Sequence, residues 1–239
     1  MELEGKRALI TGGTDGIGLA LARALRGRGA EVMVCGRDPA KLGMARAEGF
    51  EAVAADLSSG AGRDTIVAAV HAWPIDILVN NAGMGAAFDI AAPIDLASVD
   101  QCIALNLTAP IHLTARLIGA LRARPEALIV NVTSGLAIAP SSRSPVYCAT
   151  KAGLRSFTQA LRAQLAGSTV SVMEALPPVV DTAMTRDNQH AKMSPEECAR
   201  QIVAAMAAGK AEANVGMVRV LSAVHNIAAP IARRVMLRY

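Results

Sequence analysis

A tyrosine and a lysine four residues apart, with a serine thirteen residues before the tyrosine, are the residues best suited to chemistry. They are Tyr147, Lys151 and Ser134. Residues at i and i+4 of a helix share one face, so the phenol and the ammonium would project into the same space. A cation beside a phenol lowers its pKa from about 10 toward neutrality, as a general acid–base at pH 7 requires. Ser134, just after an apolar run, could hydrogen-bond the same substrate oxygen. The tyrosine–lysine spacing alone also occurs on solvated helix faces, so its meaning depends on the rest of the chain.

A glycine-rich turn near the N-terminus joins a short apolar strand to a helical pattern. It reads T-G-G-T-D-G-I-G over residues 11–18. In this context Gly12 permits a tight turn, Gly16 lets the backbone approach a phosphate, and Gly18 lets the helix pack closely on the strand. The helix N-terminus adds N–H groups and the positive end of a dipole. A glycine loop without a ligand is the alternative, but the position between strand and helix favours a dinucleotide pyrophosphate.

The turn spacing T-G-x-x-x-G-x-G, taken with motifs farther along, resembles the short-chain dehydrogenase/reductase family. Those motifs are Asn80-Asn81-Ala82-Gly83 after an apolar strand, Asn106 in N-L-T-A-P, and the set Ser134, Tyr147 and Lys151. The resemblance runs from about Gly5 to Thr182. It implies an α/β fold in one domain over 1–239: a doubly wound (Rossmann), seven-stranded parallel sheet with helices on both faces. NAD(P) would bind across the carboxyl edge of that sheet.

The resemblance also implies roles for individual residues. Tyr147 would be the acid–base, Lys151 would lower its pKa and bind the nicotinamide ribose, Ser134 would polarise the substrate oxygen, and Asn106 would hold a water of the proton relay. Asp56 matches a carboxylate that contacts the adenine amine, and 80–83 match a stretch lining adenosine and ribose. The residues that match cofactor-binding positions are Gly12, Thr14, Asp15, Gly16, Ile17, Gly18, Arg37, Asp56, Leu57, Asn81, Ala82, Gly83, Tyr147, Lys151, Pro177, Val180 and Thr182.

One motif departs from the family pattern. After the sixth predicted strand the family usually has Pro-Gly, whereas Leu176–Thr182 reads L-P-P-V-V-D-T. Pro178 in place of the glycine fixes φ and removes an N–H, so we expect a stiffer loop. The sequence of this motif and that of C-G-R-D-P-x-K-L look most like the family branch labelled as related to D-alanyl esterification of teichoic acids. That label does not identify a substrate.

The end of the second predicted strand favours NADP(H) over NAD(H). NAD-selective enzymes of this fold usually place an acidic residue there to hold the ribose hydroxyls. Here Cys35 and Gly36 occupy that place, and the guanidinium of Arg37 could pair with a 2′-phosphate. Against this, Asp15 stands in the glycine turn, where some NADP-preferring relatives carry a basic residue. Arg37 could also be a surface cation paired with Asp38.

Apolar runs alternate with helical patterns along the chain, which predicts βαβ units and a parallel sheet. Strands are predicted at 7–10, 31–35, 51–54, 75–79, 127–132, 169–174 and 215–221, and helices near 17–28, 39–48, 63–72, 96–122, 147–165 and 195–208. The polar segment 181–195 is predicted as a loop or lid over the ligand site. The basic, amphipathic tail 223–239 is expected to be a solvated terminal helix or a subunit contact rather than a membrane anchor.

Composition narrows the class of protein. The 239 residues are 52% hydrophobic but only 3% aromatic, as in a core of buried aliphatic strands. A net charge of +4 with scattered arginines argues against nucleic-acid binding and is compatible with an anionic cofactor. The four cysteines lack C-x-x-C or zinc spacing, and the four histidines are far apart, so we expect no metal site and a reducing compartment. No signal peptide or apolar run of about 18 residues is evident, which favours a cytoplasmic protein without a membrane partner.

The leading hypothesis is an NADP(H)-dependent oxidoreductase that interconverts a carbonyl and a secondary alcohol on a small to medium apolar substrate. The alternative is a catalytically weak NAD(P)-binding regulatory or scaffold protein of the same fold. A sugar-nucleotide epimerase would need a longer substrate domain than 183–239. Substrate contacts are expected from 84–94, 136–143 and 183–195, where Arg143 and Arg186 could meet an acidic group or be solvated. Members of the family often form dimers and tetramers through their two long helices, which here are predicted at 96–122 and 147–165. We therefore expect a homodimer or homotetramer.

Overall fold

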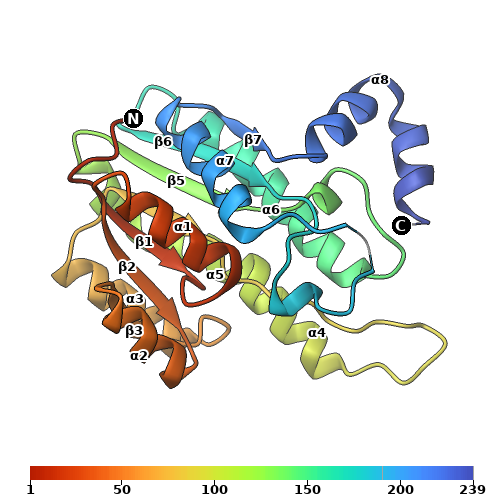
Figure 1. Ribbon diagram of the computed structural model, residues 1–239, viewed down its shortest axis with the longest axis horizontal. Coiled ribbons are helices and arrows are strands. Elements are labelled where there is room, and N and C mark those ends of the chain that lie inside the picture. The colour runs from red at the N-terminus through yellow and green to blue at the C-terminus, as the bar shows by residue number, and fades with distance from the viewer. Residues whose placement is uncertain (190, 239) are drawn as a thin grey trace.

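One parallel sheet of seven strands forms the centre of the computed structural model, which describes residues 1–189 and 191–238 (Figure 1). Its order is β3-β2-β1-β4-β5-β6-β7. The strands are β1 (Arg7–Thr11), β2 (Glu31–Gly36), β3 (Glu51–Ala54), β4 (Ile77–Asn80), β5 (Ala127–Val132), β6 (Val170–Leu176) and β7 (Glu212–Asn214). The order reverses between β1 and β4, and ligands of doubly wound sheets bind at such a switch point. The predicted fold is therefore confirmed.

Helices cover both faces of the sheet. The α-helices of the described chain are α1 (Gly16–Arg26), α2 (Pro39–Ala47), α3 (Gly60–Ala72), α4 (Leu96–Ile103), α5 (Ala109–Arg122), α6 (Pro145–Gln164), α7 (Pro195–Ala207) and α8 (Val218–Met236). Helices α1 and α7 pack together over one face, and α3 packs with α5 over the other (Figure 1). Alternate residues of β1 serve the two resulting cores: Ala8 and Ile10 belong to the first and Leu9 to the second.

The prediction of a seventh strand at 215–221 is wrong. The strand is Glu212–Asn214, which pairs with β6 through Ala213 and Ala175, and the apolar residues after it begin α8. Val215 and Val218 are buried while Val220 is 54% exposed. Burial that recurs three residues apart is typical of a turn entering a helix, whereas a strand buries every second residue. Because nearly every residue of this run is apolar, its sequence does not distinguish the two patterns.

The predicted helix at 96–122 is continuous but contains a π-helical turn, Ala104–Thr108, between α4 and α5. By length and hydropathy alone this run could cross a membrane. In the structure Leu113, Leu117 and Leu121 are fully buried in the core beneath the sheet, so packing accounts for its apolar face.

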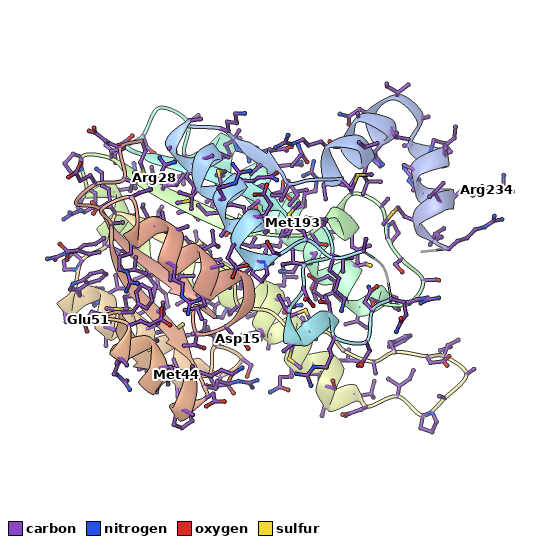
Figure 2. The ribbon with its side chains drawn as sticks, viewed as in Figure 1. Asp15, Arg28, Met44, Glu51, Met193 and Arg234 are labelled. Atoms are coloured by element: carbon purple, nitrogen blue, oxygen red, sulfur yellow. The ribbon has the colours of Figure 1, made fainter. Side chains whose placement is uncertain are left out.

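Two segments near the C-terminus differ from the expectation. The segment 181–195 carries a 3₁₀ turn, Ala183–Thr185, and a β-bridge between Val180 and Met193, so its described part is more ordered than a simple loop. His190, within it, lies outside the described residues. The tail is helical as predicted, but α8 bends at Ala228, two residues before Pro230. It forms an arm at one end of the molecule, on which Arg234 points outward (Figures 1 and 2).

Candidate active site

A cavity of about 880 Å³ lies along the carboxyl ends of the strands, at the switch point between β1 and β4. It collects every residue that the sequence predicted for the cofactor: Gly12, Thr14, Asp15, Gly16, Ile17, Gly18, Arg37, Asp56, Leu57, Asn81, Ala82, Gly83, Tyr147, Lys151, Pro177, Val180 and Thr182. Ser134 lines the same wall. Segments up to 170 residues apart therefore meet at one site because parallel strands all end at the same edge.

Helix α6 carries Tyr147 and Lys151 on one face, and the end of β5 leads to Ser134. The ammonium Nζ of Lys151 donates to the carbonyl oxygen of Val132 at 2.8 Å and lies 5.7 Å from the centre of the Tyr147 ring. Lys151 is buried, whereas Tyr147 is half-buried at the cavity wall. The hydroxyl of Ser134 hydrogen-bonds Tyr147, and its Oγ accepts from the N–H of Leu136 at 3.1 Å. A phenol, a hydroxyl and an ammonium thus converge on one space.

The expected fall of the Tyr147 pKa toward neutrality does not occur in this arrangement. Burial raises the pKa of Tyr147 to about 12, against the opposing hydrogen bond with Ser134. Burial also lowers the pKa of Lys151 to about 8. The physical reason is that the ammonium contacts the Val132 carbonyl rather than the phenol, while loss of water acts on both groups. Tyr147 is therefore a protonated donor at neutral pH.

Asn106 lies behind the cavity wall rather than in it. The π-helical turn directs its amide inward, where it is fully buried. Its Nδ2 donates to the Met84 carbonyl at 2.8 Å and to the Thr150 Oγ1 at 3.1 Å, and its Oδ1 accepts from the Met84 N–H at 2.9 Å. A Cβ on Gly83 would lie 3.3 Å from Asn106 Oδ1 and 3.6 Å from Lys151 Nζ. Asn106 thereby fastens the start of the 84–94 segment to α6, next to Lys151.

The glycine turn has the tight geometry that its sequence predicts. Gly12 has φ of +63°, in the left-handed region that favours glycine. A Cβ on Gly18 would lie 2.1 Å from the Gly12 carbonyl oxygen, so only glycine fits there. The side chain of Asp15 caps α1 by accepting from the Gly16 N–H at 2.7 Å. The remaining first-turn amides have no acceptor within the helix and lie where the helix dipole is positive.

Thr11 joins the glycine turn to the end of β4. Its Oγ1 accepts from the N–H groups of Asn81 and Ala82 at 2.9 and 3.0 Å. The Asn81 Nδ2 donates back to the Thr11 carbonyl at 2.9 Å. Asn80, which the resemblance placed with the ribose-lining stretch, instead lies buried on one face of the sheet, outside the cavity lining. Its Nδ2 donates there to Asn131 Oδ1 on β5 at 2.8 Å. That part of the prediction is wrong because the side chains of a strand alternate between faces.

The segment that follows β2 supplies two cations, one of which was not predicted from the sequence. Arg37 lies 3.6 Å from Asp56, so the alternative pairing with Asp38 is wrong. Asp38 instead caps α2, accepting from the N–H groups of Ala40 and Lys41. Lys41, in the first turn of α2, also lines the cavity and forms an ion pair with Asp15. In the sequence, Lys41 could have been found only from its position four residues after Arg37. That spacing does not predict Asp15 as the partner of Lys41.

The residues present fit a dinucleotide cofactor. The cavity is large enough for one, its glycine turn brings bare backbone to the wall, and a helix N-terminus and two cations face it. Among the described residues, the arginines proposed for an acidic substrate, Arg143 and Arg186, are exposed and do not line the cavity. Cys148 is buried against Ser141, as its predicted packing role requires.

Comparison with known proteins agrees with this geometry. The short chain dehydrogenase family model matches residues 6–193. The uncharacterized oxidoreductase DltE of Bacillus subtilis (strain 168) is 40% identical over 223 residues, covering 89% of this chain and 88% of DltE. A short chain dehydrogenase from Burkholderia cenocepacia J2315, solved in complex with NADP, has a TM-score of 0.89 at 25% identity and covers both chains fully. Another from Burkholderia phymatum, in complex with NAD, shares the fold with a TM-score of 0.82 at 22% identity over 95% of this chain and 96% of its own. The chain belongs to the short-chain dehydrogenase family of NAD(P)-dependent oxidoreductases.

Proposed function

We propose that this enzyme interconverts a carbonyl and a secondary alcohol by NADP(H)-dependent hydride transfer, with Tyr147 as the acid–base. The observation that carries the proposal is the meeting of Ser134, Tyr147 and Lys151 in the same cavity as the glycine turn. A proton donor therefore faces the space next to a dinucleotide site. The relatives named above support an oxidoreductase, and the reaction itself rests on this constellation.

The residues divide the work of carbonyl reduction. When bound, the nicotinamide supplies the hydride. Tyr147, protonated at neutral pH, gives its phenolic proton to the substrate oxygen, and Ser134 hydrogen-bonds that oxygen as negative charge develops on it. Lys151, with a pKa near 8, restores the proton to Tyr147. Asn106, whose buried amide bonds Met84 and Thr150, holds the backbone beside Lys151 in place. Alcohol oxidation runs the same steps in reverse.

The preference for NADP(H) rests on the rim of the cavity at the end of β2. Arg37 is 56% exposed there and meets Asp56 only at 3.6 Å, so it is free to turn toward a phosphate. Cys35 is buried, and a Cβ on Gly36 would lie 2.5 Å from Thr14 Oγ1. Thr14 therefore leaves no room at Gly36 for the acidic side chain that would select NAD(H).

The substrate is proposed to be a small to medium apolar carbonyl compound. Leu105, Pro178 and Met184 add apolar surface to the cavity that Tyr147 lines. The side chain of Met184 is 53% exposed, so this wall is open on one side. The described arginines of the neighbouring loops turn to solvent, which removes the main argument for an acidic substrate.

The catalytic role of Tyr147 is tested by replacing it with phenylalanine. Tyr147→Phe removes only the hydroxyl, so reduction of a screen of ketones and aldehydes by NADPH should fall at least 1000-fold. Equilibrium binding of NADPH, followed by nucleotide fluorescence, should change less than threefold. Turnover that survives in the variant would contradict the assigned acid–base. A wild-type protein that binds NADPH but reduces no compound in the screen would favour the scaffold alternative.

The enzyme is further proposed to be a cytoplasmic homodimer or homotetramer built on its long helices. The outward side of α6 carries small exposed residues, among them Ala149, Ala152 and Ala160. Helix α4 exposes Leu96 and Ile103. Small side chains let two helices approach closely, and exposed apolar ones give such a contact its stability.

A further inference from the structure

Two ion pairs lie on the cavity rim where the glycine turn meets the first turn of α2. Lys41 pairs with Asp15, and Arg37 pairs with Asp56. All four side chains line the cavity, and 39–56% of each is exposed. Figure 2 shows Asp15 at the start of α1, on the side of α2. Two cations from one short segment therefore reach the same rim, each held by a carboxylate from a different part of the chain.

Exposed ion pairs of this kind are weak and exchange readily. A phosphate monoester carries close to two negative charges near neutral pH and three acceptor oxygens, so it competes well with a single carboxylate for a lysine or an arginine. The stem of Lys41 is flexible, and its ammonium can move from the Asp15 carboxylate to a neighbouring phosphate without a change in the backbone. Arg37 can leave Asp56 in the same way.

We infer that Lys41 is a second specificity-determining cation, beside Arg37, for the phosphate monoester that distinguishes NADPH from NADH, and that Asp15 restrains it. The inference rests on the proposed use of NADP(H) and adds residues to that site. Asp15 has two functions here: its carboxylate caps α1 through the Gly16 N–H, and it holds Lys41 by an ion pair that a phosphate must replace. A neutral residue at position 15 that still caps the helix would release Lys41.

Asp15 is ionised when this competition occurs. The hydrogen bond from Lys41 holds the pKa of the Asp15 carboxyl below its ordinary value. Its negative charge repels any phosphate at the rim and occupies the Lys41 ammonium at the same time. Asparagine keeps an oxygen for the Gly16 N–H and is as good a helix cap as aspartate, so Asp15→Asn separates the charge from the capping function.

The experiment measures the ratio of dissociation constants, Kd(NADH)/Kd(NADPH), by equilibrium fluorescence titration. Lys41→Gln should lower this ratio about tenfold, which is about 1.4 kcal/mol, chiefly by weakening NADPH. Asp15→Asn should raise the ratio at least threefold, and the double variant should lose that gain. Lys6→Gln is the matched control, because Lys6 forms an ion pair with Glu126 and neither residue lines the cavity. Its ratio should equal that of the wild type.

A second probe isolates the phosphate. Adenosine 2′,5′-bisphosphate should displace NADPH with an affinity that falls in Lys41→Gln, while displacement by adenosine 5′-monophosphate should not change. An NADPH preference in the wild type that survives Lys41→Gln intact would overturn the inference and leave the proposed NADP(H) use standing. Equal binding of NADH and NADPH by the wild type would instead contradict the proposed cofactor preference. An NADH affinity close to wild type in each variant shows that the variant is folded.

Discussion

At the scale of single residues, burial in this site works against the charges that the chemistry needs. Lys151 is only 3% exposed, and its ammonium has one carbonyl oxygen as its described partner. Taking an ammonium out of water favours its neutral form, which is why its pKa falls to about 8. The folded state therefore carries a cost at neutral pH that serves the proton relay rather than stability.

Lys151→Met should make the protein more stable at pH 7 while it abolishes turnover. The pKa of Lys151 falls from 10.5 to about 8 on folding, so removing the buried charge is worth up to about 3 kcal/mol. Loss of the hydrogen bond to Val132 should lower the free energy of unfolding by about 1 kcal/mol and so offset part of that gain. Between pH 8 and 10.5 the unfolded chain binds more protons, so wild-type stability rises with pH and the advantage of the variant shrinks.

Urea unfolding of both proteins at pH 7 and pH 9.5 measures this difference. Lys210→Met, at an exposed position outside the active-site cavity, is the control and should leave the free energy of unfolding unchanged at both pH values. A Lys151→Met protein that is less stable than wild type at pH 7 would show that the ammonium stabilises the fold.

At the scale of elements, replacing a helical glycine with alanine should have opposite effects on stability in α1 and in α2. A Cβ at Gly18 of α1 would lie 2.1 Å from the Gly12 carbonyl oxygen, whereas a Cβ at Gly43 of α2 meets nothing within 4 Å. Gly18→Ala should therefore destabilise the protein by about 1–3 kcal/mol through overpacking and weaken binding of both nucleotides. Gly43→Ala should stabilise it by about 0.5–1 kcal/mol, because alanine loses less backbone entropy in a helix.

Thermal unfolding and nucleotide titration of the two alanine variants test this contrast. Each variant is the control for the other, since both add one methyl group to a helical glycine. Equal stability of the two would mean that the glycine turn can shift to admit a side chain. Its close approach to α1 would then not be a requirement of the site.

Patterns that are local in sequence predicted the elements well, and contacts distant in sequence were not predictable. The glycine turn and the Tyr147–Lys151 spacing each lie within one turn or helix, so the local sequence is enough to predict their geometry. The pairing of Lys41 with Asp15 depends on how α1 and α2 sit on the sheet, and no local pattern encodes that. The pKa of Tyr147 was mispredicted for the same reason, because helix spacing does not state where an ammonium points or how much water reaches it.

At the scale of the whole molecule, the cavity is built from both halves of the sheet. One wall comes from the β1–β3 half with its glycine turn, and the other from the β4–β6 half with Ser134, Tyr147 and Lys151. The arm formed by α8 lies at one end of the molecule (Figure 1). It packs on the chain through Val218 and Ala232, whereas Ile227 is 89% exposed. The molecule thus offers two kinds of apolar surface to another copy: the long helices and the arm.

The position of the subunit contact is tested by placing a carboxylate on each surface. If the long helices pair, a carboxylate at Ala152 of α6 would be buried without a partner, so Ala152→Glu should reduce the mass in sedimentation equilibrium toward the 24.7 kDa of one chain. Ile227→Glu on α8 should keep the wild-type mass, because a contact between the long helices leaves that side chain in solvent. The reverse result would place the contact on the arm. A wild-type chain that sediments as a monomer would contradict the proposed oligomer, and the complete cavity within one chain is then sufficient for binding and catalysis.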